Sequence, residues 1–203
     1  MKYVIGNWKM NGNKALLARF PTLPNNAALC VPHHLIEKGL GAQDCSAHES
    51  GAFTGEISAR MIADAGAKIC IVGHSERRRY HGETNEIVKQ KAARCIESGI
   101  IPIICVENPE QVAESVPEYG EKVIIAFEPP GSIGTGVVPT ADEIKKTHEE
   151  IGTAAPNTII LYGGSVDSKN AREILAIENV GGVLVGGASL DPEKFMEIVN
   201  AGR

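Results

Sequence analysis

The sequence predicts an α/β protein, a single-domain (β/α)8 barrel near the minimum length for that fold. Eight short runs of apolar or β-branched residues recur along the 203-residue chain, and segments with helical spacing of apolar residues separate most of them. Near-continuous apolar strands that alternate with amphipathic helices indicate a parallel sheet covered by helices. Eight such units favour a closed barrel over an open doubly wound sheet. No linker or low-complexity segment divides the chain, so we expect one domain over residues 1–203.

The eight predicted strands are short, and their spacing leaves one tight connection. Between the second and third strands there is little room for a crossover, which with its helix takes about 10 to 12 residues. The segment HHLIEKG, residues 33–39, therefore has space for one helical turn. The eight runs are Val4-Ile5, Leu29 to Val31, Leu40 to Ala42, Ile69 to Val72, Ile101 to Cys105, Val123 to Phe127, Thr158 to Tyr162 and Val183 to Val185.

Helical segments between the strands carry their own start and stop signals. Gly99 follows one apolar stripe and is typical of the position after a helix. Thr140 with Glu143 three residues later predicts a capping box, and Asp191 followed by Pro192 predicts the start of the last helix. The apolar stripe consists of Ile87, Val88, Ala92, Cys95 and Ile96.

Composition and charge exclude several classes of function. The chain is 43% hydrophobic and 22% charged, which predicts a globular protein with a large core. The net charge of -5 argues against a nucleic-acid surface, and the basic run Arg77 to Arg79 is too short to follow a phosphate backbone. No apolar run approaches the roughly 18 residues that would span a bilayer, and the N-terminus lacks a signal-peptide pattern. We therefore expect a cytoplasmic protein without nucleic-acid or membrane partners.

The cysteines and histidines form no familiar metal motif. None of the five cysteines forms CxxC, and three of them lie in apolar runs, where a thiol behaves as a small hydrophobe. The six histidines form neither HxxxH nor HExxH. We expect neither disulfides nor a zinc site. The cysteines are Cys30, Cys45, Cys70, Cys95 and Cys105.

Polar and glycine residues gather at the C-terminal ends of the predicted strands, where barrels of this type build their active sites. The turns YGGSV, residues 162–166, and VGGASL, residues 185–190, place backbone N–H groups where they can surround a phosphate. Tight turns that need a positive φ explain each turn equally well by itself. The residues at the strand ends are Asn7, Lys9, His74, Glu128, Ser165, Gly186 and Gly187.

The stretch AFEPPGSIGTG, residues 126–136, places the carboxylate of Glu128 between an apolar strand and a loop with two prolines and three glycines. A charged strand end followed by a solvent loop is the simple alternative to a catalytic base. The loop matches neither the GxGxxG pattern of dinucleotide sites nor a Walker loop with its lysine. A nucleotide ligand is therefore not predicted.

Several motifs together resemble the triosephosphate isomerase family, from Lys2 to about Phe195. They are GNWKMN (6–11), GAQDCSAHESGAFTGEIS (41–58), VGHSERR (72–78), FEP with IGTG (127–136), YGGSV and VGGASL. The resemblance implies a TIM barrel that interconverts dihydroxyacetone phosphate and glyceraldehyde 3-phosphate through an enediolate, without cofactor or metal, in glycolysis and gluconeogenesis. It implies Lys9, His74 and Glu128 as catalytic residues, and as substrate-binding residues Asn7, Lys9, Gly134, Ser165, Gly186 and Gly187.

The resemblance also gives the residues their roles. Glu128 resembles the base that removes a proton from the carbon beside the carbonyl. His74 resembles the electrophile, a neutral imidazole at the start of a short helix, a tuning for which this family is itself the standard example. Lys9 places a positive charge beside the enediolate oxygen and the phosphate, and Asn7 positions Lys9 and His74. The contacts implied for the free enzyme are Lys9 with Glu76 and Glu128 with Ser75.

The loop GSIGTG is implied to be a moving lid that excludes water and brings Gly134 to the phosphate. The sequence departs from the family at this point. Relatives carry a tryptophan at the position of Gly131 and a tyrosine at that of Phe127, and by resemblance the two hydrogen-bond each other when the lid is open. The segment CVEN, residues 105–108, also lacks the glycine that the family places before the glutamate. We expect an open lid that is less well anchored than in relatives.

The segment from Cys45 to Glu56 resembles the family loop that projects into a neighbouring subunit, so a homodimer is implied. Two other hypotheses stay open: a different enzyme on the same phosphate-binding barrel, such as a lyase or epimerase, and a barrel that binds phosphates with little turnover. Lys9, His74 and Glu128 at matching positions favour the isomerase.

Overall fold

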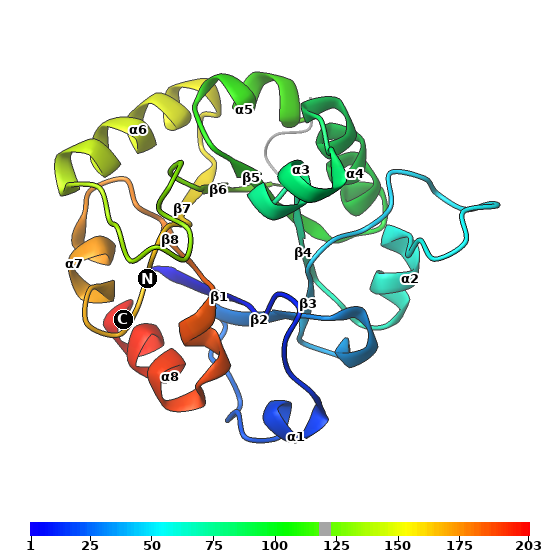
Figure 1. Cartoon of the computed structure of the whole chain (residues 1–203), viewed down its shortest axis with the longest axis horizontal. Helices are drawn as coiled ribbons and strands as arrows, with labels where there is room; N and C mark the ends of the chain where they lie inside the picture. Colours follow the sequence, from blue (N-terminus) through cyan, green and yellow to red (C-terminus); the bar gives the residue numbers. More distant parts are fainter. Residues whose placement is uncertain (118–122) are drawn as a thin grey trace.

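The closed barrel predicted from the sequence is present in a computed structural model of the chain, which describes residues 1–117 and 123–203. Eight strands in these ranges pair in parallel with their sequence neighbours, and the last pairs with the first (Figure 1). The predicted (β/α)8 barrel is thereby confirmed. The strands are β1 Tyr3–Asn7, β2 Ala27–Val31, β3 Gly41–Ala42, β4 Ile69–Val72, β5 Ile101–Val106, β6 Ile124–Phe127, β7 Ile159–Tyr162 and β8 Gly182–Val185.

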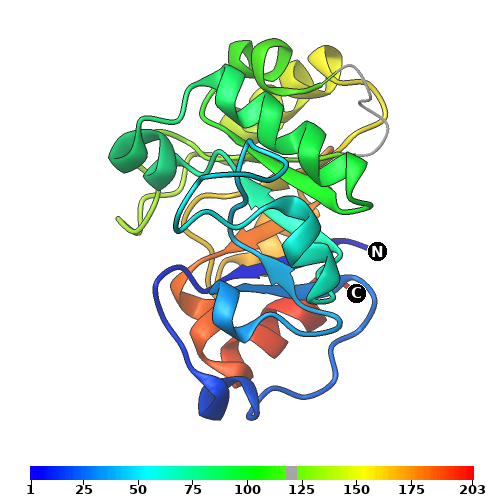
Figure 2. The same cartoon turned by 90° about the vertical axis from the view of Figure 1, so that its right-hand side faces the viewer.

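Helices form an outer ring around these strands (Figure 1). Figure 2 shows α3 and the loop after β6 projecting from one end of the barrel, while both chain termini lie at the other end. The helices are α1 Lys14–Leu17, η1 His33–Leu35, α2 Ala59–Asp64, α3 Ser75–His81, α4 Asn85–Glu97, α5 Glu110–Ser115, α6 Ala141–Ala154, α7 Ala171–Ala176, η3 Gly187–Leu190 and α8 Pro192–Ala201. No helix in the described ranges is both long enough and apolar enough to cross a membrane.

The core has two layers, divided by the strands. The inner layer fills the barrel with side chains from its strands, for example Cys30 of β2 and Ile71 of β4. A second layer, which includes Cys45, Cys70 and Cys95, lies between the strands and the helices. Successive residues of a strand point to opposite faces, which is why Cys70 and Ile71 of β4 belong to different layers. The barrel is therefore filled, and the site must lie at its end.

The tight connection between the second and third strands is present as predicted. Its segment contains the single turn η1, and β3 has two residues where the sequence predicted Leu40 to Ala42. The close packing around residue 41 leaves space only for a glycine. A Cβ built there would lie 2.6 Å from Ile69 Cγ1 and 2.7 Å from Cys30 Sγ.

The predicted helix signals are confirmed. Thr140 and Glu143 form a reciprocal capping box at α6, and the Asp191 side chain accepts bonds from two backbone amides at the start of α8. On α4 the buried face includes Lys91 among apolar side chains, which the sequence did not predict. The charge of Lys91 requires partners.

Candidate active site

All eight predicted site residues line one cavity at the C-terminal ends of the strands. Because parallel strands end at the same edge, residues that follow different strands meet there. The cavity has a volume of about 310 Å³. The eight residues are Asn7, Lys9, His74, Glu128, Gly134, Ser165, Gly186 and Gly187.

Glu128, directly after β6, presents a buried carboxylate to the cavity, with 1% of its side chain exposed. Its Oε2 accepts a hydrogen bond of 2.8 Å from the backbone N–H of Ser75. Its Oε1 lies 3.0 Å from Nε2 of His74. The backbone N–H of Ser75 thus holds one carboxylate oxygen, and the predicted contact between Glu128 and Ser75 is present.

His74 is the N-cap residue of α3, and its ring orientation follows from this position. The Nδ1 atom accepts a hydrogen bond of 3.2 Å from the backbone N–H of Glu76. A ring nitrogen that accepts carries no proton, so the proton of this imidazole lies on Nε2. Nε2 lies close to Glu128, although Oε1 of Glu128 has no hydrogen-bond partner among the described residues.

Lys9 combines an unusual backbone with a defined side-chain partner. Its φ is +54°, a left-handed conformation that costs a non-glycine residue about 1 to 2 kcal/mol. The Lys9 backbone N–H donates to Oδ1 of Asn7 at 3.0 Å, which holds this turn in place. The ammonium lies 2.6 Å from Oε1 of Glu76, so the predicted Lys9–Glu76 pair is present. Strain of this kind is typical of functional sites.

The opposite side of the cavity is made of backbone and hydroxyl groups. Ser165 Oγ donates to the carbonyl of Ser132 at 2.6 Å and accepts from the N–H of Gly136 at 3.1 Å. These two bonds tie the lid to the turn after β7. Asn170, which the sequence analysis missed, donates to the Ser165 carbonyl at 3.1 Å and fixes the turn itself.

The two lid positions that depart from the family have clear structural settings. Phe127 is buried and meets the ring of His148 edge-on, with the ring centroids 5.9 Å apart. Gly131 has a φ of +76°. A side chain at this position would be strained in the observed loop, so glycine matches the backbone conformation that the lid adopts.

A partly buried ion-pair network joins Asp44, Arg77, Glu83 and Lys91. Nζ of Lys91 lies 2.7 Å from Asp44 and 2.5 Å from Glu83, and Nε of Arg77 lies 2.9 Å from Asp44. The network connects α3 and α4 to the segment after β3. Its members are far apart in sequence, so no local pattern predicted it.

Arg78 of the SERR segment is a second anchor and does not line the phosphate side. Its Nε donates to the carbonyl of Gly73 at 2.9 Å, and Nη2 donates to the carbonyl of Cys105 at 3.0 Å. These bonds fasten the start of α3 to β4 and β5. The arginine therefore orients the helix that carries His74 and Glu76.

Comparison with known proteins shows which family this chain belongs to. The family model of triosephosphate isomerase matches residues 2–202. The triosephosphate isomerase of Thermus thermophilus is 39% identical, over 97% of this chain and 96% of the relative, and that of Rhodopseudomonas palustris is 40% identical, over 96% and 95%. The alignment with the Thermus protein spans 244 positions, so the relative contains residues that this shorter chain lacks.

A solved structure gives the same result for the fold. The crystal structure of triosephosphate isomerase from Bartonella henselae superposes with a TM-score of 0.85 at 32% identity and covers 98% of both chains. The shared fold, the sequence identity and the family match extend over nearly the whole chain. This chain therefore belongs to the triosephosphate isomerase family.

Proposed function

We propose that Glu128 is the base with which this chain interconverts dihydroxyacetone phosphate and D-glyceraldehyde 3-phosphate. The reaction removes a proton from the carbon next to a carbonyl and returns it to the neighbouring carbon. The observation that carries the proposal is the 3.0 Å approach of Glu128 Oε1 to His74 Nε2 in a cavity that also contains Lys9. One carboxylate between two adjacent carbons can serve both transfers, so no cofactor or metal is required.

His74 and Lys9 then stabilise the negative charge that develops on the substrate oxygens. With its proton on Nε2, His74 donates a hydrogen bond to the enediolate oxygens. The Lys9 ammonium supplies the positive charge, and its bond to Glu76 keeps it at the mouth until an anion binds. Asn7 holds the strained backbone of Lys9 and acts as a positioning residue.

The glycine side binds the phosphate through backbone N–H groups. Gly186 and Gly187 lie at the start of η3, and Gly134 lies in the lid. Bonds from Ser165 hold the lid beside the turn after β7, where it would cover a bound phosphate. Exclusion of water protects the enediolate phosphate, which would otherwise eliminate phosphate.

A coupled assay of the purified chain tests the activity. Dihydroxyacetone phosphate formed from glyceraldehyde 3-phosphate is reduced by an added dehydrogenase, and consumption of its nicotinamide cofactor is followed. The control is the His74→Gln variant, purified in the same way, because a contaminating host isomerase would give equal rates in both preparations. Equal rates, or no activity in the wild type, would contradict the proposal.

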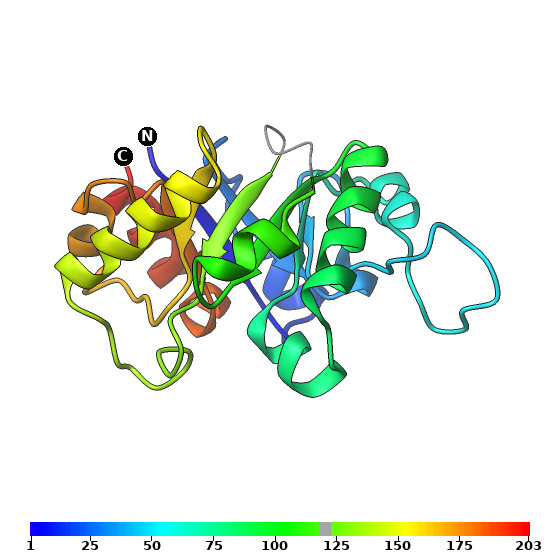
Figure 3. The same ribbon diagram turned by 90° about the horizontal axis from the view of Figure 1, so that it is seen from above.

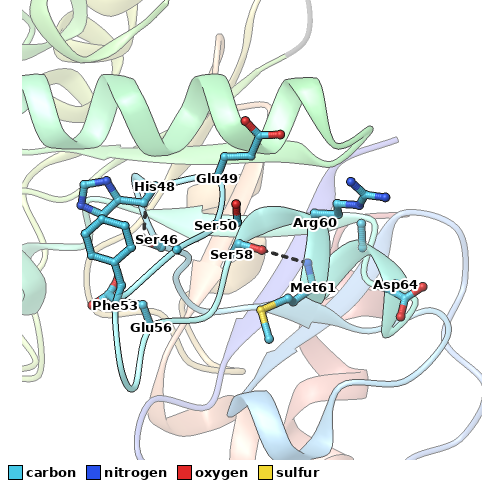
Figure 4. A pocket seen from close by; sticks show the side chains of 12 residues that line it. Ser46, His48, Glu49, Ser50, Phe53, Glu56, Ser58, Arg60, Met61 and Asp64 are labelled. Carbon is cyan, nitrogen blue, oxygen red and sulfur yellow. Dashed lines mark hydrogen bonds between the residues drawn. The ribbon is translucent and has the colours of Figure 1, made fainter.

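The loop from Cys45 to Glu56 supports assembly as a homodimer. Figure 3 shows the segment between β3 and α2 extending away from the barrel. In this loop the ring of Phe53, 41% exposed, stacks on His48 with centroids 3.7 Å apart, beside a cavity of about 610 Å³ (Figure 4). None of the eight site residues lines this cavity.

A socket for the partner's loop is available next to the active site. A third cavity, of about 940 Å³, is lined by Lys9 and His74 together with the exposed side chains of Met10 and Tyr80. A loop and a socket on the same chain form a twofold interface in which each subunit supports the other's lysine and histidine. Light scattering should show a dimer, and an active species near 21.6 kDa at assay concentration would contradict it.

The chain is proposed to form one domain and to act in the cytoplasm. Residues 1–203 act as one domain, because strands from both ends of the chain pair to close the barrel. The reaction belongs to glycolysis and gluconeogenesis, so the proposed location is the cytoplasm. Fractionation of the source cells with a soluble marker enzyme tests this location.

A further inference from the structure

Three cysteines that are distant in sequence meet in one place. Cys45 follows β3, Cys70 belongs to β4 and Cys95 belongs to α4. Their three Sγ atoms all lie within 4.8 Å of one another, and the Sγ atoms of Cys45 and Cys95 are 3.5 Å apart. We call this group the trithiol cluster. The isomerase reaction makes no use of it.

The trithiol cluster is buried and lies in the layer between the strands and the helices. Cys45 is 2% exposed, and Cys70 and Cys95 are not exposed. The thiol of Cys70 donates a hydrogen bond of 3.4 Å from Sγ to the carbonyl of Ile71, and that of Cys45 donates one of 3.8 Å to the carbonyl of Lys91. One buried thiol is explained as a small hydrophobe, but three thiols directed at one another form a set of sulfur ligands.

The spacing matches a three-coordinate metal site. With metal–sulfur bonds of about 2.3 Å, three sulfurs around one ion lie about 4 Å apart. The sulfur separations in the trithiol cluster, from 3.5 Å to less than 4.8 Å, bracket this value. In the part of the chain that the structure describes, no imidazole or carboxylate joins the group. Structural zinc sites have four protein ligands, so a three-sulfur set favours ions softer than zinc.

We propose that Cys45, Cys70 and Cys95 form a binding site for one soft, thiophilic metal ion of the class that includes Cu⁺ and Cd²⁺. On binding, each S–H bond breaks, a metal–sulfur bond forms and one proton is released per thiol. No oxidation or reduction takes place. The absence of CxxC spacing argued only against a zinc site, and the proposed site for a softer ion depends on contacts between distant segments.

The trithiol cluster lies outside the barrel interior, at the base of the loop from Cys45 to Glu56. Cys45 begins the exposed loop that ends at Glu56, and the side chain of Arg94 holds the base of this loop by a bond of 3.4 Å to the carbonyl of Ala47. Cys30 lies inside the barrel and does not belong to the group, which makes it the matched control.

Cd²⁺ titration of the reduced full-length protein, with reductant removed under argon, tests the site. Thiolate-to-metal absorption in the ultraviolet and intact mass should show one Cd²⁺ per chain, and proton release should accompany binding. Cys45→Ala, Cys70→Ala and Cys95→Ala should each weaken binding at least about 100-fold, because each removes a ligand. Cys30→Ala should bind as the wild type does. Circular dichroism checks folding, and a variant that fails to fold is replaced by its serine counterpart.

Three results would overturn the proposal. The first is no thiolate absorption in the wild type. The second is equal Cd²⁺ affinity in the wild type and all three cluster variants, which would indicate surface binding. The third is a combination of two measurements. The protein purified in air has two fewer free thiols than its five cysteines, and the reduced protein does not bind Cd²⁺. The close Cys45–Cys95 pair would then be a disulfide site.

Discussion

The two sides of the active-site mouth are built from different groups. On the α3 side, His74 and Glu76 stand on a short helix that Arg77 and Arg78 fasten to the barrel through charged side chains. On the lid side, the proposed binding groups are backbone amides, and the hydroxyl of Ser165 makes two hydrogen bonds to the lid. One side is held by partly buried charges and the other by hydrogen bonds near solvent.

This difference indicates how each side responds to change. Proton transfer requires side chains in fixed positions, and ion pairs supply that rigidity. Removal of one partner of such a pair then costs much of the folding stability. Phosphate binding requires N–H groups and a lid that can open. Weak hydrogen bonds suit the lid because they break easily when it opens. Changes on the α3 side should therefore affect turnover and folding, and changes on the lid side should affect substrate affinity.

The largest effect is expected at Glu128, where the two sides meet. Glu128→Gln keeps the shape but removes the base, and we expect kcat to fall by about 10² to 10⁴. Binding of a phosphate analogue should change little, because proton transfer occurs only in the transition state. Steady-state kinetics with calorimetric binding measures both. Unchanged kcat would remove Glu128 from the mechanism.

Lys91→Met should show how strongly the α3 side depends on its buried charges. Burial alone would lower the pKa of Lys91, but Asp44 and Glu83 more than offset it and raise the pKa. The substitution leaves buried Glu83 and partly buried Asp44 with only Arg77 as a cation, and we expect a loss of about 3 to 5 kcal/mol in the free energy of unfolding. Urea unfolding measures it. Lys89→Met, at a half-buried lysine of the same helix, is the control and should cost under about 1 kcal/mol.

Acid should reveal the weaker support of the lid side, where His148 is buried behind Phe127. Burial lowers the pKa of His148 from 6.5 to about 4, although a bond to the Asn179 carbonyl opposes this shift. Because the folded pKa is below the unfolded one, the stability contributed by neutral His148 is full above pH 6.5 and is lost as the pH falls toward 4. At pH 5 the loss should be about 2 kcal/mol.

Unfolding at pH 7 and pH 5 separates this contribution from those of other groups. His148→Leu should remove about 2 kcal/mol of the difference between the two pH values. His34→Leu, at an exposed histidine, should leave the difference as in the wild type. An identical pH dependence in all three proteins would show that His148 does not titrate in this range.

Much of the fold and the site could be predicted, because the signals are local or carried by motifs. The capping box at Thr140 depends on two residues that are three positions apart. The change from apolar to polar residues at the strand ends indicates Glu128 and His74. Motifs such as VGHSERR then assign roles that spacing alone does not give.

What could not be predicted depends on contacts between distant segments. A lysine on a helix is expected to be exposed, and only the packing of α4 on the barrel brings Lys91 to Asp44. The trithiol cluster has the same origin, since Cys45 and Cys70 meet Cys95 only when β3, β4 and α4 are assembled. Neither group has a sequence spacing that would reveal it.

The smallest effect is expected at Ser165, whose hydroxyl makes two bonds to the lid. Ser165→Ala removes both, but water can replace them when the lid is open, so only the closed state is weakened. Net hydrogen-bond energies near solvent predict a loss of about 1 kcal/mol, or about a fivefold rise in KM, with kcat within about twofold.

Ser168→Ala is the matched control for this change, because Ser168 lies on the same turn and its side chain makes no hydrogen bond within the described part of the chain. It should leave KM unchanged. If Ser165→Ala instead lowered kcat strongly at constant KM, the lid would act on the chemical step. The contrast between a catalytic side and a binding side would then fail, because a hydrogen bond near solvent would be controlling proton transfer at Glu128.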